Sequence, residues 1–72
     1  MKENPELKAL GQRIRELRKA KGFSQEEFAH VTGLERSYYG RIERGEINVT
    51  SRNLLRIAKA LGEPVGSLFS AN

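Results

Sequence analysis

The sequence predicts an all-α domain of five short helices, and three observations support this fold class. Glycines and prolines divide the 72 residues into short segments. Within these segments apolar side chains recur at spacings of three and four, which is the period of an amphipathic helix. Long segments that alternate β-branched and polar residues are absent. We therefore expect one compact domain over residues 1–72, with short connections between its helices.

The first expected helix extends from Pro5 to about Lys21. Asn4 is a suitable N-cap, and proline is favoured at the first helical position. Gly22 follows and is expected to end the helix. The apolar stripe that faces the core contains Leu7, Leu10, Ile14 and Leu17.

The second expected helix begins with a capping box. The Ser24 hydroxyl and the Glu27 carboxylate can each accept a hydrogen bond from an exposed amide at the helix start. Gly33 ends this helix. Its buried face contains Phe28, Ala29 and Thr32.

The third expected helix extends from about Glu35 to Arg44, and Gly45 closes it. Tyr39 and Ile42 are expected to face the core. The opposite side carries Arg36, Ser37, Gly40, Arg41 and Arg44.

The fourth expected helix follows Thr50, a suitable N-cap, and stops at Gly62. Pro64 is expected to start a short fifth helix over residues 64–69. The apolar stripe of the fourth helix contains Leu54, Ile57, Ala58 and Leu61.

The composition excludes several classes of protein. The chain has no cysteine, which excludes disulfide frameworks and cysteine-based zinc clusters. It has no aspartate, and its one histidine, His30, projects away from the apolar stripe. We therefore expect no enzyme, no metal, no cofactor and no small-molecule ligand. Because no apolar run is long enough to cross a membrane and no signal peptide is evident, we expect a cytoplasmic protein without a membrane partner.

The second and third helices have the spacing of a helix-turn-helix motif. Such a motif needs a tight turn that tolerates a positive φ, which Gly33 supplies, and a small residue where the helices cross, which Ala29 supplies. The exposed face of the third helix is polar and basic. These features favour DNA binding more strongly than the formal net charge of +4, much of which lies on the first helix.

The sequence resembles the Cro/repressor-type, or xenobiotic-response-element, helix-turn-helix family of bacterial and phage regulators. The resemblance covers residues 10–69 and rests on LGQRIRELRKAKG, FSQEEFAHVTGLERSYYGRIERG and NLLRIAKALG. It implies a compact five-helix lambda-repressor-like domain, with the helix-turn-helix at 24–45 and the third helix in the DNA major groove. The segment ERSYYGRIERGEINVT also looks like the corresponding region of restriction-modification controller proteins.

The resemblance and the side-chain chemistry nominate the DNA contacts. The base contacts that the resemblance implies are Arg36, Ser37 and Arg41. An arginine fork fits the O6 and N7 acceptors of guanine, and serine is an adaptable donor or acceptor. The expected phosphate contacts are Gln25, Tyr38, Arg44, Asn48, Arg52 and Asn53. The alternative is that Arg36, Arg41 and Arg44 form an ordinary solvated helix face. In that case Arg52 serves surface solubility, and Tyr38 is merely exposed.

Two positions in the third helix need an explanation. Gly40 costs about 1 kcal/mol of helix stability relative to alanine. It indicates either a close approach to DNA or to the second helix, or a position where little depends on the side chain. Tyr39 stands where the family usually carries Ile or Val, so its hydroxyl needs water or a polar partner.

The inner faces of the first and third helices predict an ion pair. Glu43 follows Tyr39 by four residues and therefore turns toward the interior, where an unpaired carboxylate is costly. Arg18 lies four residues after Ile14, on the inner face of the first helix. The family resemblance pairs the same two positions, and we predict an ion pair between Arg18 and Glu43.

The function that we predict is a sequence-specific DNA-binding transcriptional regulator that binds a palindromic operator as a homodimer. The expected dimer interface contains Leu55, Val65, Leu68 and Phe69. The alternative for the last two is that they only close the core of the monomer. Two other functions remain open: an antitoxin or adaptor whose main role is protein binding, and a non-specific nucleic-acid binder that uses its basic first helix.

Overall fold

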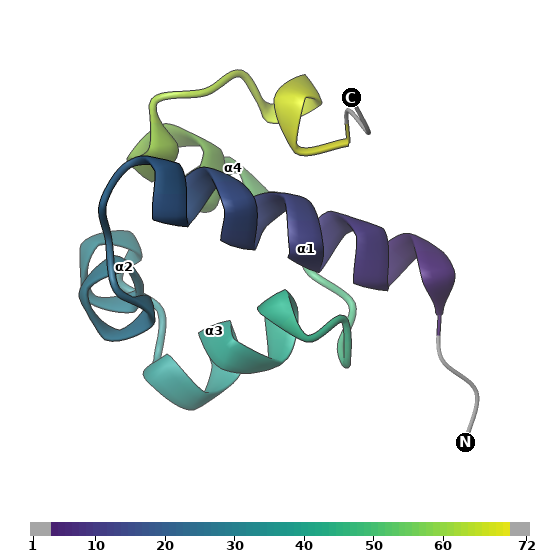
Figure 1. Cartoon of the computed structure of the whole chain (residues 1–72). Coiled ribbons are helices and arrows are strands. Elements are labelled where there is room, and N and C mark those ends of the chain that lie inside the picture. The colour runs from purple at the N-terminus through teal and green to yellow at the C-terminus, as the bar shows by residue number, and fades with distance from the viewer. Residues whose placement is uncertain (1–3, 70–72) are drawn as a thin grey trace.

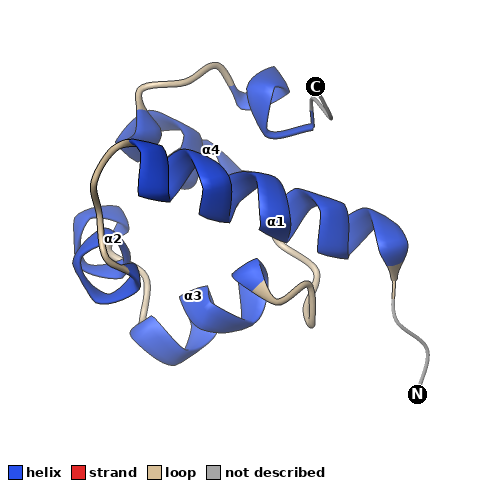
Figure 2. Cartoon of the chain, in the orientation of Figure 1, coloured by secondary structure: helices blue, strands red, loops and turns tan. Residues whose placement is uncertain are grey.

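A computed structural model describes residues 4–69 of the chain. The described part contains α1 (Pro5–Ala20), α2 (Gln25–Thr32), α3 (Arg36–Glu43), α4 (Ser51–Leu61) and a 3-10 helix, η1 (Val65–Phe69). Figure 2 shows these helices joined by loops, without a strand between residues 4 and 69. The predicted all-α class is confirmed. The predicted number of helices is corrected to four α-helices and one 3-10 helix.

The long first helix, α1, packs mainly against α3 and η1. It contacts α3 on one side and η1 on another, and α2 contacts both α3 and α4. Figure 1 shows α1 crossing the domain, with α3 below it, η1 above it and α2 near its C-terminal end. The end of the described chain returns to α1, since η1 contacts both α1 and α4.

The predicted N-caps form as expected at Asn4, Ser24 and Thr50. The capping box is complete, because the amide of Glu27 donates to the Ser24 hydroxyl at 3.0 Å and the amide of Ser24 donates to the Glu27 carboxylate at 2.9 Å. Glu35 was expected inside the third helix, but it is the N-cap of α3. Its carboxylate accepts a hydrogen bond of 3.0 Å from the amide of Tyr38.

One hydrophobic core joins all five elements. Its aromatic centre is Phe28, whose ring centroid lies 5.3 Å from that of Phe23 and 5.4 Å from that of Tyr39. The buried apolar residues are Leu10, Ile14, Phe28, Ala29, Tyr39, Ile42, Ile57, Ala58, Leu61 and Leu68. Leu7, Leu17 and Leu54, which belong to the predicted stripes, are half-buried.

The C-terminal segment differs from the predicted fifth α-helix. Five residues with Gly66 among them are too few for a stable α-helix, and the chain instead forms the tighter 3-10 turn, in which the amide of Ser67 donates to the carbonyl of Pro64 at 2.9 Å. Leu68 is fully buried in the core of the monomer. This burial corrects its placement in a dimer interface, because Leu68 has no exposed surface to offer a second chain.

Glycines at the contact of α1 and α3 allow the two backbones to approach closely. A β-carbon at Gly11 would lie 2.4 Å from the carbonyl oxygen of Glu43 and 2.5 Å from that of Ile42. At Gly45, where φ is +72°, a β-carbon would lie 2.7 Å from the Cα of Lys8. These contacts were not predicted, and they set the position of the end of α3 against α1.

Candidate nucleic-acid interface

The helix-turn-helix predicted over residues 24–45 is formed by α2, a short turn and α3. Gly33 adopts a φ of +77°, and its amide donates to the carbonyl of His30 at 3.1 Å. The amide of Leu34 donates to the carbonyl of Ala29 at 3.1 Å, so hydrogen bonds from both residues close the turn. Ala29 is buried beside the turn. The turn residue and the small crossing residue therefore take their predicted places.

The exposed face of α3 carries the three predicted base-contacting residues. Arg36, Ser37 and Arg41 are exposed. Tyr39 and Ile42, on the other side of the same helix, are 0% and 1% exposed. Burial on one side leaves α3 with a polar, cationic side that meets solvent.

Gly40 lies on the predicted exposed face but is buried, which corrects its placement. A β-carbon there would lie 3.2 Å from Nη1 of Arg44 and 3.5 Å from Oε1 of Gln25. Gly40 is therefore covered by one side chain from α2 and one from the end of α3. The nearest atoms all belong to side chains, so the structure shows no close approach of the α2 backbone to Gly40.

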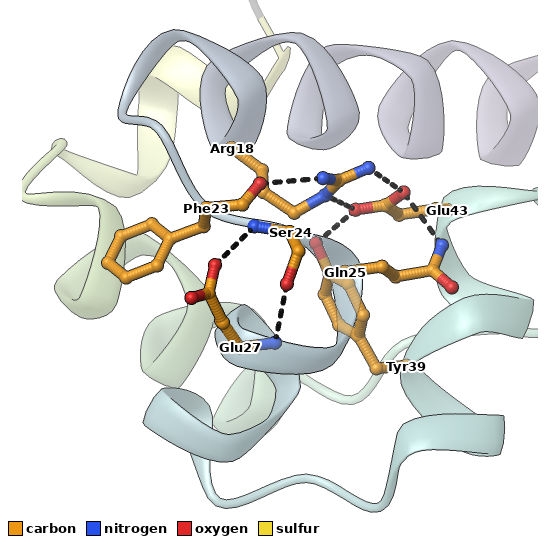
Figure 3. A network of polar contacts seen from close by, with 7 residues as sticks. All are labelled: Arg18, Phe23, Ser24, Gln25, Glu27, Tyr39 and Glu43. Atoms are coloured by element: carbon orange, nitrogen blue, oxygen red, sulfur yellow. Dashed lines mark hydrogen bonds and ion pairs between the residues drawn. The ribbon is translucent and has the colours of Figure 1, made fainter.

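The predicted ion pair is present and lies inside the domain. Nε of Arg18 donates to Oε2 of Glu43 at 2.6 Å, and Nη2 donates to Oε1 at 3.1 Å. The two side chains are only 7% and 2% exposed. Nη1 of Arg18 donates to the carbonyl of Phe23 at 2.8 Å. Figure 3 shows this bidentate pairing between α1 and α3.

Two further donors complete the network around Glu43. The Tyr39 hydroxyl donates to Oε2 of Glu43, which supplies the polar partner that a buried tyrosine requires. Nε2 of Gln25 donates to Oε1 of Glu43 at 3.1 Å (Figure 3). The Glu43 carboxylate therefore joins α1, the start of α2 and α3 through one fully satisfied polar cluster.

The network shifts the pKa values of its members. Burial alone would raise the pKa of Glu43, but hydrogen bonds from Arg18, Tyr39 and Gln25 outweigh it and hold that pKa below its ordinary value. Burial and the bond to Glu43 both raise the pKa of the Tyr39 hydroxyl, which keeps its proton and its role as a donor. The bond to Glu43 likewise raises the pKa of Arg18.

The structure brings some of the predicted phosphate-contacting residues together. Nδ2 of Asn53 donates to the Tyr38 hydroxyl at 3.0 Å, and both residues are half-buried, so the first turn of α4 is tied to α3. Gln25 is also half-buried, and its side-chain amide donates a hydrogen bond to Glu43. The residues that remain exposed are Arg44, Asn48 and Arg52.

Comparison with known proteins assigns this architecture to a family. Residues 14–68 match the helix-turn-helix family. The chain is a helix-turn-helix protein.

The helix-turn-helix protein is similar to control proteins of restriction-modification systems. It is 41% identical to control protein C.SmaI of Serratia marcescens over 61 residues, which are 85% of this chain and 73% of that protein. It is 44% identical to control protein C.MunI of Mycoplasma sp over 62 residues, or 85% of this chain and 84% of that protein. The solved structure of the restriction-modification controller protein C.AhdI from Aeromonas hydrophila superimposes with a TM-score of 0.89 at 50% identity, covering 92% of this chain and 100% of that chain.

One charged residue of this helix-turn-helix protein was missed by the sequence reasoning. Glu46 follows the end of α3, and its Oε2 lies 2.9 Å from Nε of Arg44, while its Oε1 lies 3.6 Å from Nε of Arg41. The pairing with Arg44 lowers the pKa of Glu46 and raises the pKa of Arg44. The signal was the order of residues, because an acidic residue directly after a helix-ending glycine is brought back toward the last turn.

Large apolar side chains are exposed on α4 and η1 of this helix-turn-helix protein. Leu55 is 57% exposed and Phe69 is 63% exposed, while Val65 is 37% exposed. Val31 on α2 is also exposed.

Among the described residues, no helix has the length and apolar character needed to cross a bilayer.

Proposed function

We propose that this helix-turn-helix protein is a sequence-specific DNA-binding transcriptional regulator that places α3 in the major groove. The observation that carries the proposal is the contrast between the two sides of α3. One side exposes Arg36, Ser37 and Arg41, and the other is anchored by the buried pair of Arg18 and Glu43. A rigid helix loses little conformational freedom on binding, so its side chains can discriminate between base edges.

The remaining polar residues suit contacts to the DNA backbone. Arg44 and Arg52 are exposed cations, and Asn48 lies exposed in the loop between α3 and α4. The bond between Tyr38 of α3 and Asn53 in the first turn of α4 holds two polar groups together. Phosphate contacts of this kind position a protein on the duplex without reading its sequence, and they complement base contacts from α3.

We propose that the regulator acts as a homodimer on a palindromic operator. One domain of this size contacts too little DNA for tight selectivity, and a two-fold dimer reads two half-sites about 34 Å apart. The exposed apolar residues Leu55, Val65 and Phe69 are candidates for an isologous interface. Leu68 is buried in the core of the monomer and is not part of this candidate surface.

The similarity to control proteins indicates which genes the protein regulates. The similarity to C.SmaI, C.MunI and C.AhdI extends over most of this chain. It supports the proposal that the protein controls the genes of a restriction-modification system. A regulator of this kind works without a catalytic step and acts in the cytoplasm.

Selection of binding sites from a random duplex pool tests the proposal, together with the mass of the protein in solution. We expect the selected duplexes to share an inverted repeat, and the protein to have the mass of two chains. A pool that shows no enriched sequence after repeated rounds would overturn sequence-specific binding. A monomeric mass on the selected duplex would overturn the dimeric mode.

A further inference from the structure

The end of α3 places a carboxylate among the cations that the proposed interface uses. The amide of Gly45 donates to the carbonyl of Ile42 at 3.0 Å, and the amide of Glu46 donates to the carbonyl of Arg41 at 3.0 Å. These two bonds form a Schellman motif, which requires the positive φ found at Gly45. The backbone of Glu46 is therefore fixed beside Arg41.

The side chain of Glu46 pairs with both Arg41 and Arg44. It accepts hydrogen bonds from Arg44 at 2.9 Å and 3.4 Å, and it forms an ion pair with Arg41 at 3.6 Å. The side chains of Arg41, Arg44 and Glu46 are about half exposed, at 53%, 56% and 47%. A bidentate contact between a guanidinium and an anion is the same contact that an arginine makes with a DNA phosphate.

Most of the other charged residues around Glu46 are basic. Together with Arg44 it lines a surface hollow between the start of α1 and the end of α3, to which Lys8 and Arg15 also contribute. The other acid of this hollow is Glu43, which is buried and paired with Arg18. Glu46 is thus the exposed carboxylate of a cationic region, among the described residues that line it.

We propose that Glu46 is a specificity-determining residue that weakens binding to arbitrary DNA more than binding to the operator. This inference rests on the proposed function. Binding to arbitrary DNA comes almost entirely from contacts to phosphates. A carboxylate that competes with these phosphates for Arg44 therefore weakens the main source of that binding. Binding to the operator also includes base contacts, and Glu46 favours these by holding Arg41 in place before DNA arrives. Discrimination between the operator and arbitrary DNA rises when a repulsive group weakens the binding of arbitrary DNA more than that of the operator.

The experiment compares Glu46→Gln with a matched control, Glu63→Gln. Both variants change the net charge by the same amount, but Glu63 pairs with Lys21 at 3.7 Å, in the segment after α4. The dissociation constants of the full chain are measured on the selected operator duplex and on a scrambled duplex of equal length, over a series of salt concentrations. Glu46→Ala removes the same carboxylate in a different way, and thermal unfolding checks that each variant is folded.

We expect Glu46→Gln and Glu46→Ala to tighten binding to the scrambled duplex by about threefold to tenfold, and to steepen its salt dependence by about one unit. The operator affinity changes less, so the ratio of the two dissociation constants falls. Glu63→Gln leaves that ratio at the wild-type value. Unchanged binding of the scrambled duplex by folded Glu46 variants would overturn the inference, as would an equal fall in the ratio for Glu63→Gln. A wild-type protein without any preference for a selected duplex would instead overturn the proposed function itself.

Discussion

Arg18 and Glu43 form a bidentate ion pair between α1 and α3, and it is buried on both sides. The pair links two properties of the domain. It contributes to the stability of the packed helices, and it sets the orientation of the helix that carries Arg36 and Arg41 on its outer face. A buried pair with all of its hydrogen bonds made is costly to break, because the remaining partner keeps its charge without compensation.

Replacing Arg18 by methionine is expected to lower the free energy of unfolding by about 3–5 kcal/mol. Methionine retains much of the apolar stem but leaves Glu43 without its cation. Arg15→Met, on the exposed side of α1, is the control and is expected to change stability by less than about 0.5 kcal/mol. Urea denaturation gives both values. Equal stability of the two variants would show that the pair contributes little.

The pKa of Glu43 predicts a loss of stability in acid. This pKa is lower in the folded protein than its ordinary value of 4.5. A group with a depressed folded pKa stabilises the protein fully above its unfolded pKa, and that contribution is lost as the pH falls through the folded pKa. Unfolding free energies measured from neutral pH to about pH 3 should therefore decline below about pH 4.5. In Glu43→Gln the decline should be smaller, and parallel curves for the two proteins would contradict the assignment.

The same substitution at two glycines is expected to have opposite effects. Gly11→Ala places a β-carbon against the backbone carbonyls of α3, which cannot move aside easily, and should destabilise the domain by about 1–3 kcal/mol. In Gly40→Ala the β-carbon meets the flexible end of Arg44 at 3.2 Å and lies in ordinary contact with the Gln25 side chain at 3.5 Å. Its gain in helix propensity of up to about 1 kcal/mol should therefore prevail. Thermal unfolding of both variants measures the difference, and a stabilised Gly11→Ala would refute the close backbone contact.

Mutations in the proposed interface are expected to separate base contacts from phosphate contacts. Arg36→Ala should relax the preference at particular base pairs, at a cost of about 1–3 kcal/mol on the preferred sequence. Arg52→Ala should weaken all sequences alike and reduce the salt slope by about one unit. Repeating the site selection with each variant distinguishes these outcomes. A uniform loss for Arg36→Ala would remove it from the base-contacting set.

A charge placed at Leu55, an exposed apolar residue of α4, is expected to separate the proposed dimer. Leu55→Glu puts a carboxylate where the two copies would meet, and the desolvation cost should shift the mass in solution toward a single chain. Val31→Glu changes a similarly exposed apolar residue on α2 and serves as the control. Sedimentation at several protein concentrations gives the masses. A dimer that tolerates Leu55→Glu but not Val31→Glu would place the interface elsewhere.

Local chemistry explains why much of the fold was predictable from the sequence. Asn4, Ser24 and Thr50 are caps because their side chains can accept from amides two or three residues ahead, and this depends on few other parts of the chain. The pair of Arg18 and Glu43 was predictable from burial, since an inward-facing carboxylate requires a cation and few inward-facing cations exist.

Features that depend on the path of the chain in space were not predictable in the same way. The exposure of Leu68 is decided by how η1 returns to α1 and α4, and periodicity does not describe that return. The contact of Gly11 with α3 depends on how closely two helices approach, to within an atomic radius. The position of Glu46 depends on the reversal at Gly45, which carries a residue outside the helix back to Arg41 and Arg44.

The most direct test of the central claim, that the outer face of α3 reads DNA, is a comparison of amide NMR spectra with and without the selected duplex. We expect the largest changes in α3, at Arg36, Ser37 and Arg41, with smaller changes in the first turn of α4. The opposite result, with the largest changes on the exposed side of α1 at Arg15 and Lys19 and none in α3, would contradict the claim and indicate non-specific binding through the first helix.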